Sequence, residues 1–215
     1  MSKIDKTCSK TRKNRRGNIK SPLFTKEEYH SGDGMLTTVW GPSMWHVLHA
    51  MSFNYPIHPT RDDMIHYREF VLNLEYVLPC KYCRINLEKN FKQLPLTMEK
   101  MKNRDTFSKY IYDLHELVNK MLNKNSHLTY DDVRERYEHF RARCTQDLIL
   151  STAAIEHTRK SSPLSPKKKS LKRKEKGCTE PLYGKKAKCI LKIVPQEEVC
   201  DTFQIDQKCV KKRLM

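Results

Sequence analysis

The strongest constraint on the fold is a helical spacing of apolar residues in the middle of the chain. Between residues 36 and 144 these residues recur at steps of three and four, and no segment shows sustained two-residue alternation. Such steps place side chains on one face of a helix, whereas alternation would place them on one face of a strand. The pattern predicts an all-α domain, a four-helix bundle plus a short fifth helix.

Residues that start and stop helices divide this region into five predicted helices. They begin after Gly41-Pro42-Ser43, at Thr60, around Cys80, at Asp105 and at Thr129. Thr60 and Thr129 are each followed by acidic residues, which suits an N-cap and a first turn, and prolines stop the first two helices. The predicted core positions include Trp45, Leu48, Phe53, Ile65, Phe70, Leu74, Val77, Phe107, Ile111, Leu114, Val118, Met121, Leu122, Val133, Tyr137 and Phe140.

The net charge of the 215-residue chain is +17, but the basic residues are spread unevenly. Residues 36–144 hold 16 basic and 13 acidic side chains, whereas residues 145–215 hold 17 and 8. The composition predicts a disordered basic arm over 1–35, the helical domain over 36–144, a Ser/Pro/Lys-rich linker over 145–177 and a basic cysteine-containing tail over 178–215. Such tails attract phosphate, so nucleic acid or an anionic surface is a predicted partner.

Three further patterns bear on location and on the tail. The apolar runs are too short to cross a bilayer, and the first residues lack the apolar segment of a secretory signal. We therefore expect no transmembrane segment and a cytoplasmic rather than secreted protein. The Lys/Arg block at 167–174 matches a nuclear signal, and residues 189–194 could form one short strand.

Cys80-Lys-Tyr-Cys83 is the sharpest motif in the chain. Two cysteines three residues apart can close a disulfide, and a helix N-terminus with Lys81 and Arg84 nearby would favour the thiolate. The alternatives are half of a zinc site and a pair of structural thiols. Structural zinc needs four ligands. The sequence offers no second such pair beyond His46 and His49, which lie among core residues, so we predict no metal site.

Two further sets of residues could line a ligand site. His115, Asn119 and Asn123 step by four, so they share one face of the predicted helix. Trp45 and His49 lie one helical turn apart and could stack on a planar ring. The alternatives are a solvated polar face for the first set, and a core aromatic with a hydrogen-bonded histidine for the second.

The order and spacing of these motifs resemble the Erv/ALR family of FAD-linked sulfhydryl oxidases. The matching residues are Trp45-x-x-x-His49, Tyr55-Pro56, Cys80-x-x-Cys83 and His115-x-x-Val118-Asn119-x-x-Leu122-x-Lys124, within about residues 38–144. The opening Trp40-Gly-Pro-Ser-Met-Trp-His-Val-Leu-His is most similar to the compact members from large cytoplasmic DNA viruses. The resemblance therefore concerns roughly the central half of the chain.

The resemblance implies a helical bundle that holds FAD, oxidises protein dithiols to disulfides and reduces dioxygen to hydrogen peroxide. Cys80 would then accept electrons from the substrate, and Cys83 would lie against the flavin as a thiolate. Val118 and Leu122 would form an apolar wall. The implied cofactor contacts are Trp45, His49, Tyr55, His115, Asn119, Asn123, Lys124 and Tyr137.

Several residues depart from the family pattern. Glu116 follows His115 where the family usually has asparagine, and Tyr137 follows an arginine where the family has tryptophan. Residues 125–132 contain no cysteine, so Cys144 is free, paired with a tail cysteine or intermolecular. One or two of the tail cysteines could act as an electron shuttle; these are Cys178, Cys189, Cys200 and Cys209.

Family membership would also imply a homodimer and, for a viral protein, location in the host cytoplasm or the virion. Two other functions stay open from the sequence: a basic helical nucleic-acid-binding protein with a structural cysteine pair, and a non-catalytic helical bundle. The charge distribution argues against the first as the main function, because most of the basic excess lies outside the domain that carries the cysteine motif.

Overall fold

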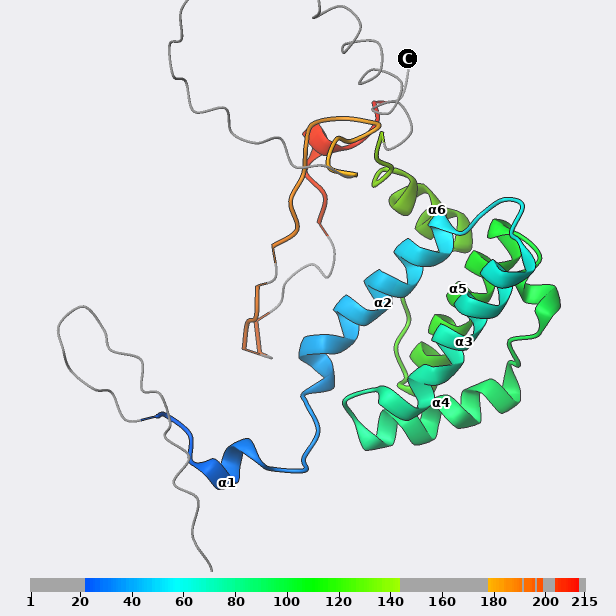
Figure 1. Cartoon of the computed structure of the whole chain (residues 1–215). Helices are drawn as coiled ribbons and strands as arrows, with labels where there is room; N and C mark the ends of the chain where they lie inside the picture. Colours follow the sequence, from blue (N-terminus) through cyan, green and yellow to red (C-terminus); the bar gives the residue numbers. More distant parts are fainter. Residues whose placement is uncertain (1–21, 144–177, 191, 196, 199–203, 213–215) are drawn as a thin grey trace, which may run out of the picture. The chain divides into compact units, whose positions relative to one another are not determined.

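A computed structural model describes residues 22–143, 178–190, 192–195, 197–198 and 204–212. Four long helices, α2 to α5, are followed by the shorter α6 (Figure 1). No β-strand occurs in these ranges, so the predicted all-α fold is confirmed. The helices are α1 (Lys26–Tyr29), α2 (Thr37–Asn54), α3 (Arg61–Val77), α4 (Lys81–Gln93), the 3-10 helix η1 (Met98–Met101), α5 (Arg104–Met121), α6 (Tyr130–Glu138) and the 3-10 helix η2 (Gln207–Cys209).

The chain divides into two units, Met1–Gly34 and Met35–Met215. The described part of the first unit contains α1, a single turn that the sequence did not predict because it carries no apolar period. A capping box holds it: the Thr25 hydroxyl accepts the Glu28 N–H, and the Glu28 carboxylate accepts the Thr25 N–H. The domain boundaries and the disorder of the tails remain predictions, and residues 145–177 lie outside the described ranges.

Helix α2 begins at Thr37, so the predicted start at Gly41-Pro42-Ser43 is wrong. The extra turn is held in place because the Met35 N–H donates to the Pro79 carbonyl at 2.9 Å and the Trp40 indole N–H donates to the Met35 carbonyl at 3.1 Å. Pro42 lies in the second turn, where it removes one backbone donor without ending the helix. The start of α2 is thereby tied to the residue that precedes Cys80.

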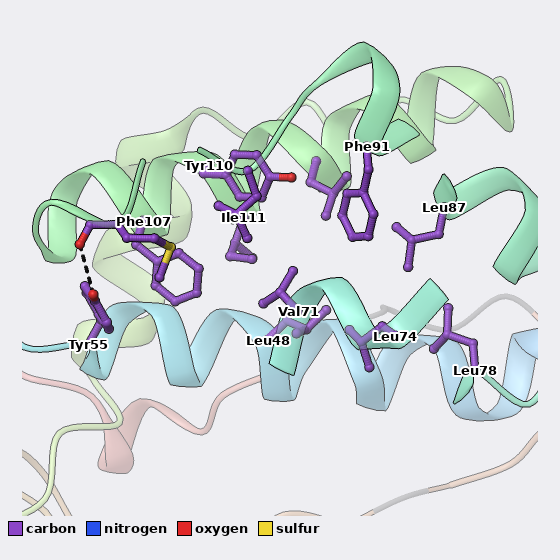
Figure 2. Close-up of a cluster of buried hydrophobic side chains, with 13 residues drawn as sticks. Leu48, Tyr55, Val71, Leu74, Leu78, Leu87, Phe91, Phe107, Tyr110 and Ile111 are labelled. Atoms are coloured by element: carbon purple, nitrogen blue, oxygen red, sulfur yellow. Dashed lines mark hydrogen bonds between the residues drawn. The ribbon is translucent and has the colours of Figure 1, made fainter. Parts of the chain in front are cut away.

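Helix α3 presents a different face to the core than the sequence predicted. Val71, Leu74 and Leu78 are buried, whereas Phe70 is 41% and Val77 67% exposed. Both sets have three- and four-residue spacing, so periodicity alone could not choose between the two faces. Figure 2 shows the buried set turned toward the side chains of α4 and α5. Of the predicted stripe on this helix, only Leu74 is buried.

The core joins α2, α3, α4 and α5, with α5 packed against α2 along its length (Figures 1 and 2). Tyr55 is completely buried, and its hydroxyl donates to the Met101 carbonyl at 2.9 Å. The predicted α5 stripe is confirmed at Phe107, Ile111 and Leu114 but ends before Met121 and Leu122, which are half exposed. The core therefore fills the middle of the bundle and thins toward the end of α5.

The described part of the tail contains no strand at the place that the sequence suggested. Cys189, Ile190 and residues 192–194 adopt no regular structure, and one isolated bridge joins Ala142 to Pro181. Within the described ranges, none of the helices combines the length and the apolar composition needed to cross a bilayer.

Candidate active site

Cys80 and Cys83 lie where α4 begins. Pro79 precedes the helix, Cys80 is its N-cap, and the Cys80 sulfur accepts the Cys83 N–H at 3.3 Å. Both cysteines are free thiols in this structure, and both are partly buried. Cys83 packs against the core cluster. The pair is therefore fixed by the helix start and remains accessible from one side.

Hydrogen bonds tune the acidity of the two thiols. The Cys83 side chain, which hydrogen-bonds to Cys80, lowers the pKa of the Cys80 thiol, whereas burial raises the pKa of Cys83. Arg84, expected from the sequence to act on the thiols directly, instead donates to the Leu78 carbonyl. Of the reduced pair, Cys80 is the more readily ionised.

Thr37 is a neighbour of the cysteines that the sequence analysis missed. Its hydroxyl oxygen lies 3.6 Å from the Cys83 sulfur, within hydrogen-bonding range for sulfur. Thr37 is the first residue of α2, so the N-termini of two helices meet at the cysteine pair. The early start of α2 creates this contact, and no local sequence motif marks it.

A second group of predicted residues comes together farther along α2. The rings of Trp45 and His115 stack, with centroids 4.0 Å apart and planes 8° apart. The His49 Nε2 lies 3.0 Å from the His115 Nδ1, and the Tyr137 ring is centred 5.3 Å from that of His49. We call Trp45, His49, His115 and Tyr137 the aromatic cluster. Three helices, α2, α5 and α6, contribute to it.

The imidazoles of this cluster are uncharged at neutral pH. Burial, reinforced by the positive charges that His115 and His46 would carry, lowers the pKa of His49 to about 3. Burial also lowers the pKa of His115 to about 4, against the opposing effect of Glu116. The His49 Nδ1 is buried and has no hydrogen-bond partner among the described residues. The two imidazoles are therefore neutral, and His49 contributes one buried polar atom that has no partner among the described residues.

His46 lies beside the aromatic cluster. Its Nδ1 lies 3.1 Å from the Tyr137 hydroxyl, and its ring packs against the Tyr137 ring of the aromatic cluster. Within the part of the chain that the structure describes, no three His, Cys, Asp or Glu side chains lie together in a way that could hold a metal ion.

The polar residues at the end of α5 are arranged differently from the prediction. The helix ends at Met121, and Asn123 adopts a positive φ of 54°. The Lys124 N–H then donates to the Asn119 carbonyl at 2.8 Å, which closes the helix end. Asn123 therefore does not continue the face of His115 and Asn119, and that prediction is wrong.

Asn119 and Lys124 keep a place near the aromatic cluster. The Asn119 amide donates to Glu116 Oε1 at 2.9 Å, and the Ser126 hydroxyl donates to the same oxygen at 2.9 Å. The positive charge of Lys124 acts on His115, whose pKa it lowers. Glu116 thus links the end of α5 to the loop that follows.

Tyr55 is not brought to the aromatic cluster. It is fully buried among Tyr67, Phe107 and the Met101 carbonyl, where it serves packing. Val118 is half-buried, but Leu122 is 50% exposed and forms no closed wall. A cavity of about 380 Å³ lies between α5 and the loop before α6, with Glu116 and Ser126 in its lining; neither the cysteine pair nor Trp45 lines it.

The remaining cysteines are placed only in part. Cys178 is disulfide-bonded, and Cys189 and Cys209 are free thiols. Cys8, Cys144 and Cys200 lie outside the described residues. The pairing of Cys144 and the shuttle role of the tail cysteines therefore stay predictions.

Comparisons with known proteins place the helical domain in a family. The sequence model of the Erv1 / Alr family matches residues 42–138. A probable FAD-linked sulfhydryl oxidase of Acanthamoeba polyphaga mimivirus is 38% identical over 99 residues, which cover 46% of this chain and 68% of that protein. A protein of Invertebrate iridescent virus 6, also named for FAD-linked sulfhydryl oxidase, is 34% identical over 90 residues, 40% of this chain and 81% of its own.

Among solved structures, the FAD binding domain of Erv1 from Saccharomyces cerevisiae aligns with a TM-score of 0.44 and 23% identity. The alignment covers 48% of this chain and 94% of that one. The viral relatives match this chain over most of their own length, and residues 42–138, which the family model matches, contain the cysteine pair and the aromatic cluster. The chain therefore belongs to the Erv1/Alr family.

Proposed function

We propose that this chain is an FAD-dependent thiol oxidase that forms disulfides in protein substrates through Cys80 and Cys83 and reduces dioxygen to hydrogen peroxide. The observation that carries the proposal is that one helix, α2, connects a reactive cysteine pair to a neutral aromatic cluster. The names of the viral relatives, which are FAD-linked sulfhydryl oxidases, support the same enzyme class.

The residues present fit a flavin nucleotide. Flat rings at Trp45, His115 and Tyr137 offer stacking surfaces, and uncharged imidazoles can lie against an aromatic ring system without a desolvation penalty. The buried, unpartnered His49 Nδ1 suits a ligand hydrogen bond, and the exposed Lys124 suits a pyrophosphate. These residues would hold FAD, together with Asn119.

The cysteine pair carries out the exchange with the substrate. When Cys80 and Cys83 form a disulfide, a substrate thiolate attacks the Cys80 sulfur and displaces Cys83 as a thiolate. The second substrate thiolate then attacks the substrate sulfur of this mixed disulfide and displaces Cys80 as a thiolate, which releases the substrate disulfide and leaves both cysteines reduced. The chemistry that bound FAD supplies is the transfer of two electrons and two protons from this dithiol to dioxygen, yielding hydrogen peroxide.

The packing supports different roles for the two cysteines. Cys80 stands at the exposed start of α4, where a protein thiol can reach it. Cys83 packs against the core cluster and contacts α2, the helix that also carries Trp45 and His49. This arrangement supports Cys80 as the substrate-facing cysteine and Cys83 as the cofactor-facing one.

A second copy of the chain is the proposed partner for the outward face of α3. Phe70 and Val77 are exposed there, together with Tyr76, which is 71% exposed. Exposed apolar side chains grouped on one helix suit a protein interface. A measurement of molar mass by light scattering would test this: a monomer at all concentrations would contradict it. The viral origin of the relatives supports a location in the host cytoplasm or the virion.

The central experiment is a visible absorption spectrum of the purified full chain, followed by oxygen uptake with dithiothreitol. We expect flavin absorbance and oxygen consumption that requires the dithiol. A matched variant, Cys189→Ser, removes an exposed tail thiol and should leave both unchanged. A colourless protein that consumes no oxygen after incubation with FAD would contradict the proposed function.

A further inference from the structure

Two short segments of the basic tail are joined into one unit. The Lys185 N–H donates to the Lys208 carbonyl at 2.8 Å. Gly184 has a positive φ of 63°, and a Cβ at this position would lie 2.6 Å from the carbonyl carbon of Cys209. Only glycine allows both the backbone conformation and this close approach. The contact between residues 183–185 and 208–212 is therefore specified by the sequence.

Residues 180–182, which directly precede the first segment, contact the residues that follow α6. The Leu182 N–H donates to the Arg141 carbonyl at 2.7 Å, and the Arg143 N–H donates to the Glu180 carbonyl at 2.9 Å. The Arg143 guanidinium also donates to the carbonyls of Pro181 and Leu182. These bonds give the tail segments a defined conformation that a freely solvated basic run would lack.

A cavity of about 510 Å³ lies between the two segments, and four of the seven described residues that line it are lysines. These lysines are Lys185, Lys208, Lys211 and Lys212, and the described residues of the lining include no acidic side chain. Among the described residues, none of these four forms an ion pair; the neighbouring Glu180 pairs with Lys186 instead. Asp206 accepts the Lys208 backbone N–H and so caps η2. The ammonium groups are thus left available for an external anion.

We propose that this cavity, which we call the tail cleft, binds the phosphate backbone of single-stranded nucleic acid. Four lysines that form no ion pair among the described residues line one hollow, so they can contribute positive charge for several phosphates. Tyr183 lines the same hollow, with the Lys211 ammonium 4.8 Å from its ring centroid, and offers a face on which a base can stack.

A membrane surface fits these observations less well. Binding to a bilayer favours an amphipathic helix with an apolar face that inserts between lipids. The described part of the tail contains only the three-residue η2, and the lysines surround a hollow with an aromatic ring in its wall. This binding would be separate from thiol oxidation, because none of the cleft residues belongs to the cysteine pair or the aromatic cluster.

The test measures fluorescence anisotropy of a labelled oligothymidylate of about twenty nucleotides with the full chain. The variant Lys208→Gln/Lys211→Gln removes two charges from the tail cleft. The matched control Lys188→Gln/Lys192→Gln removes two charges from exposed lysines outside it. We expect the cleft variant to bind about tenfold more weakly, with a log–log salt slope smaller by about 1.4, and the control to change binding much less.

Tyr183→Ala provides an independent readout of base stacking. It should weaken binding to the oligothymidylate by about tenfold. It should leave binding of inorganic polyphosphate, which has no bases, nearly unchanged. Equal losses in the two lysine variants would overturn the tail cleft, because they would show a general effect of tail charge. Absence of oligonucleotide binding, or binding only to vesicles containing phosphatidylserine, would overturn the assignment to nucleic acid.

Discussion

The two ends of α2 serve opposite purposes and are built accordingly. At its N-terminus, Thr37 meets a pair of free thiols that are partly exposed, beside Tyr82, which is 78% exposed. In its C-terminal half, His49 is only 3% exposed and Phe53 only 6%. One end is open to a protein-sized reactant, and the other excludes water.

The difference suits the chemistry that we propose for each end. Thiol–disulfide exchange proceeds by direct attack of one sulfur on another, so the exchanging cysteine must be reachable. Retention of a flat cofactor depends on stacking and on uncharged neighbours, which burial supplies. Thr37 and His49 are separated by about 18 Å along the helix, so one rigid element can hold both ends in register. We therefore expect that a substitution at one end of α2 can abolish the function of that end and leave the other end intact.

The largest expected effect is at the exposed end. Cys83→Ser should lower dithiothreitol-dependent oxygen uptake by at least about a thousandfold, because no intramolecular disulfide can then form with Cys80. Flavin absorbance should persist, since the aromatic cluster does not depend on this sulfur. The control Cys189→Ser should retain full turnover of the small dithiol. Retained activity in Cys83→Ser, or loss of bound flavin from this variant, would show that the two ends of α2 do not act separately.

At the buried end, acid should destabilise the fold. The pKa of His115 is about 4 in the folded chain and about 6.5 when unfolded, so the unfolded state takes up a proton first as the pH falls. The stabilisation is complete above pH 6.5 and is lost progressively toward pH 4. This difference in pKa corresponds to up to about 3 kcal/mol. Urea unfolding midpoints between pH 7 and pH 4.5 measure it.

The matched comparison for this pH effect uses two histidines. His115→Asn removes a buried imidazole, so the unfolding free energy of this variant should depend less on pH below 6.5. His58→Asn removes an exposed imidazole and serves as the matched control. Equal pH dependence in the wild type and in His115→Asn would show that the aromatic cluster is not the neutral region that the comparison requires.

The features that the sequence predicted well depend on neighbours in the chain. Thr60 and Thr129 form capping boxes with residues three positions later, as their sequences indicated. Cys80 is an N-cap directly after Pro79. Trp45 and His49 share a helix face because they are four residues apart. Each of these outcomes follows from the local chain.

The features that the sequence missed depend on contacts between distant segments or on how an element ends. The burial of Val71 in place of Phe70 depends on where α4 and α5 pack. Asn123 lies outside α5, because the helix ends at Met121 and Asn123 adopts a positive φ. Apolar periodicity does not indicate such a helix end. The contact of Thr37 with Cys83 spans 46 residues and requires the pairing of Met35 with Pro79.

Thr37 allows a smaller, more selective change at the exposed end. Thr37→Val removes the hydroxyl that lies beside the Cys83 sulfur. In the wild type, this hydroxyl lowers the pKa of the Cys83 thiol. Loss of one hydrogen bond to a thiolate corresponds to about 1 kcal/mol, so turnover should fall roughly fivefold. The rise in activity with pH should also move to higher pH. Oxygen uptake measured against pH provides both readouts.

Two controls separate this hydroxyl from general effects on α2. Thr37→Ser keeps the hydroxyl and should restore most of the activity and the original pH profile. Thr38→Val removes the adjacent, exposed hydroxyl and should have little effect. If Thr37→Val and Thr38→Val gave the same pH profile, the hydrogen bond to Cys83 would have no functional role.

The smallest expected effect concerns the support of the buried end. Glu116 accepts hydrogen bonds from Asn119 and Ser126, and its negative charge raises the pKa of His115. Glu116→Gln keeps the shape of the side chain but removes the charge, so the His115 pKa should fall further. The charged acceptor also contributes more to these bonds than a neutral amide oxygen does. Unfolding free energy at pH 7 should decrease by about 1 kcal/mol.

The effect of this variant should be confined to the aromatic cluster and should not reach the cysteine pair. The affinity for FAD should fall severalfold, measured by flavin release on dilution, whereas the alkylation rate of Cys80 in the reduced protein should stay the same. Glu69→Gln removes an exposed carboxylate from α3 and serves as the charge-matched control. A changed Cys80 alkylation rate in Glu116→Gln would mean that α2 transmits strain between its ends, and the two regions would then have to be treated as one coupled site.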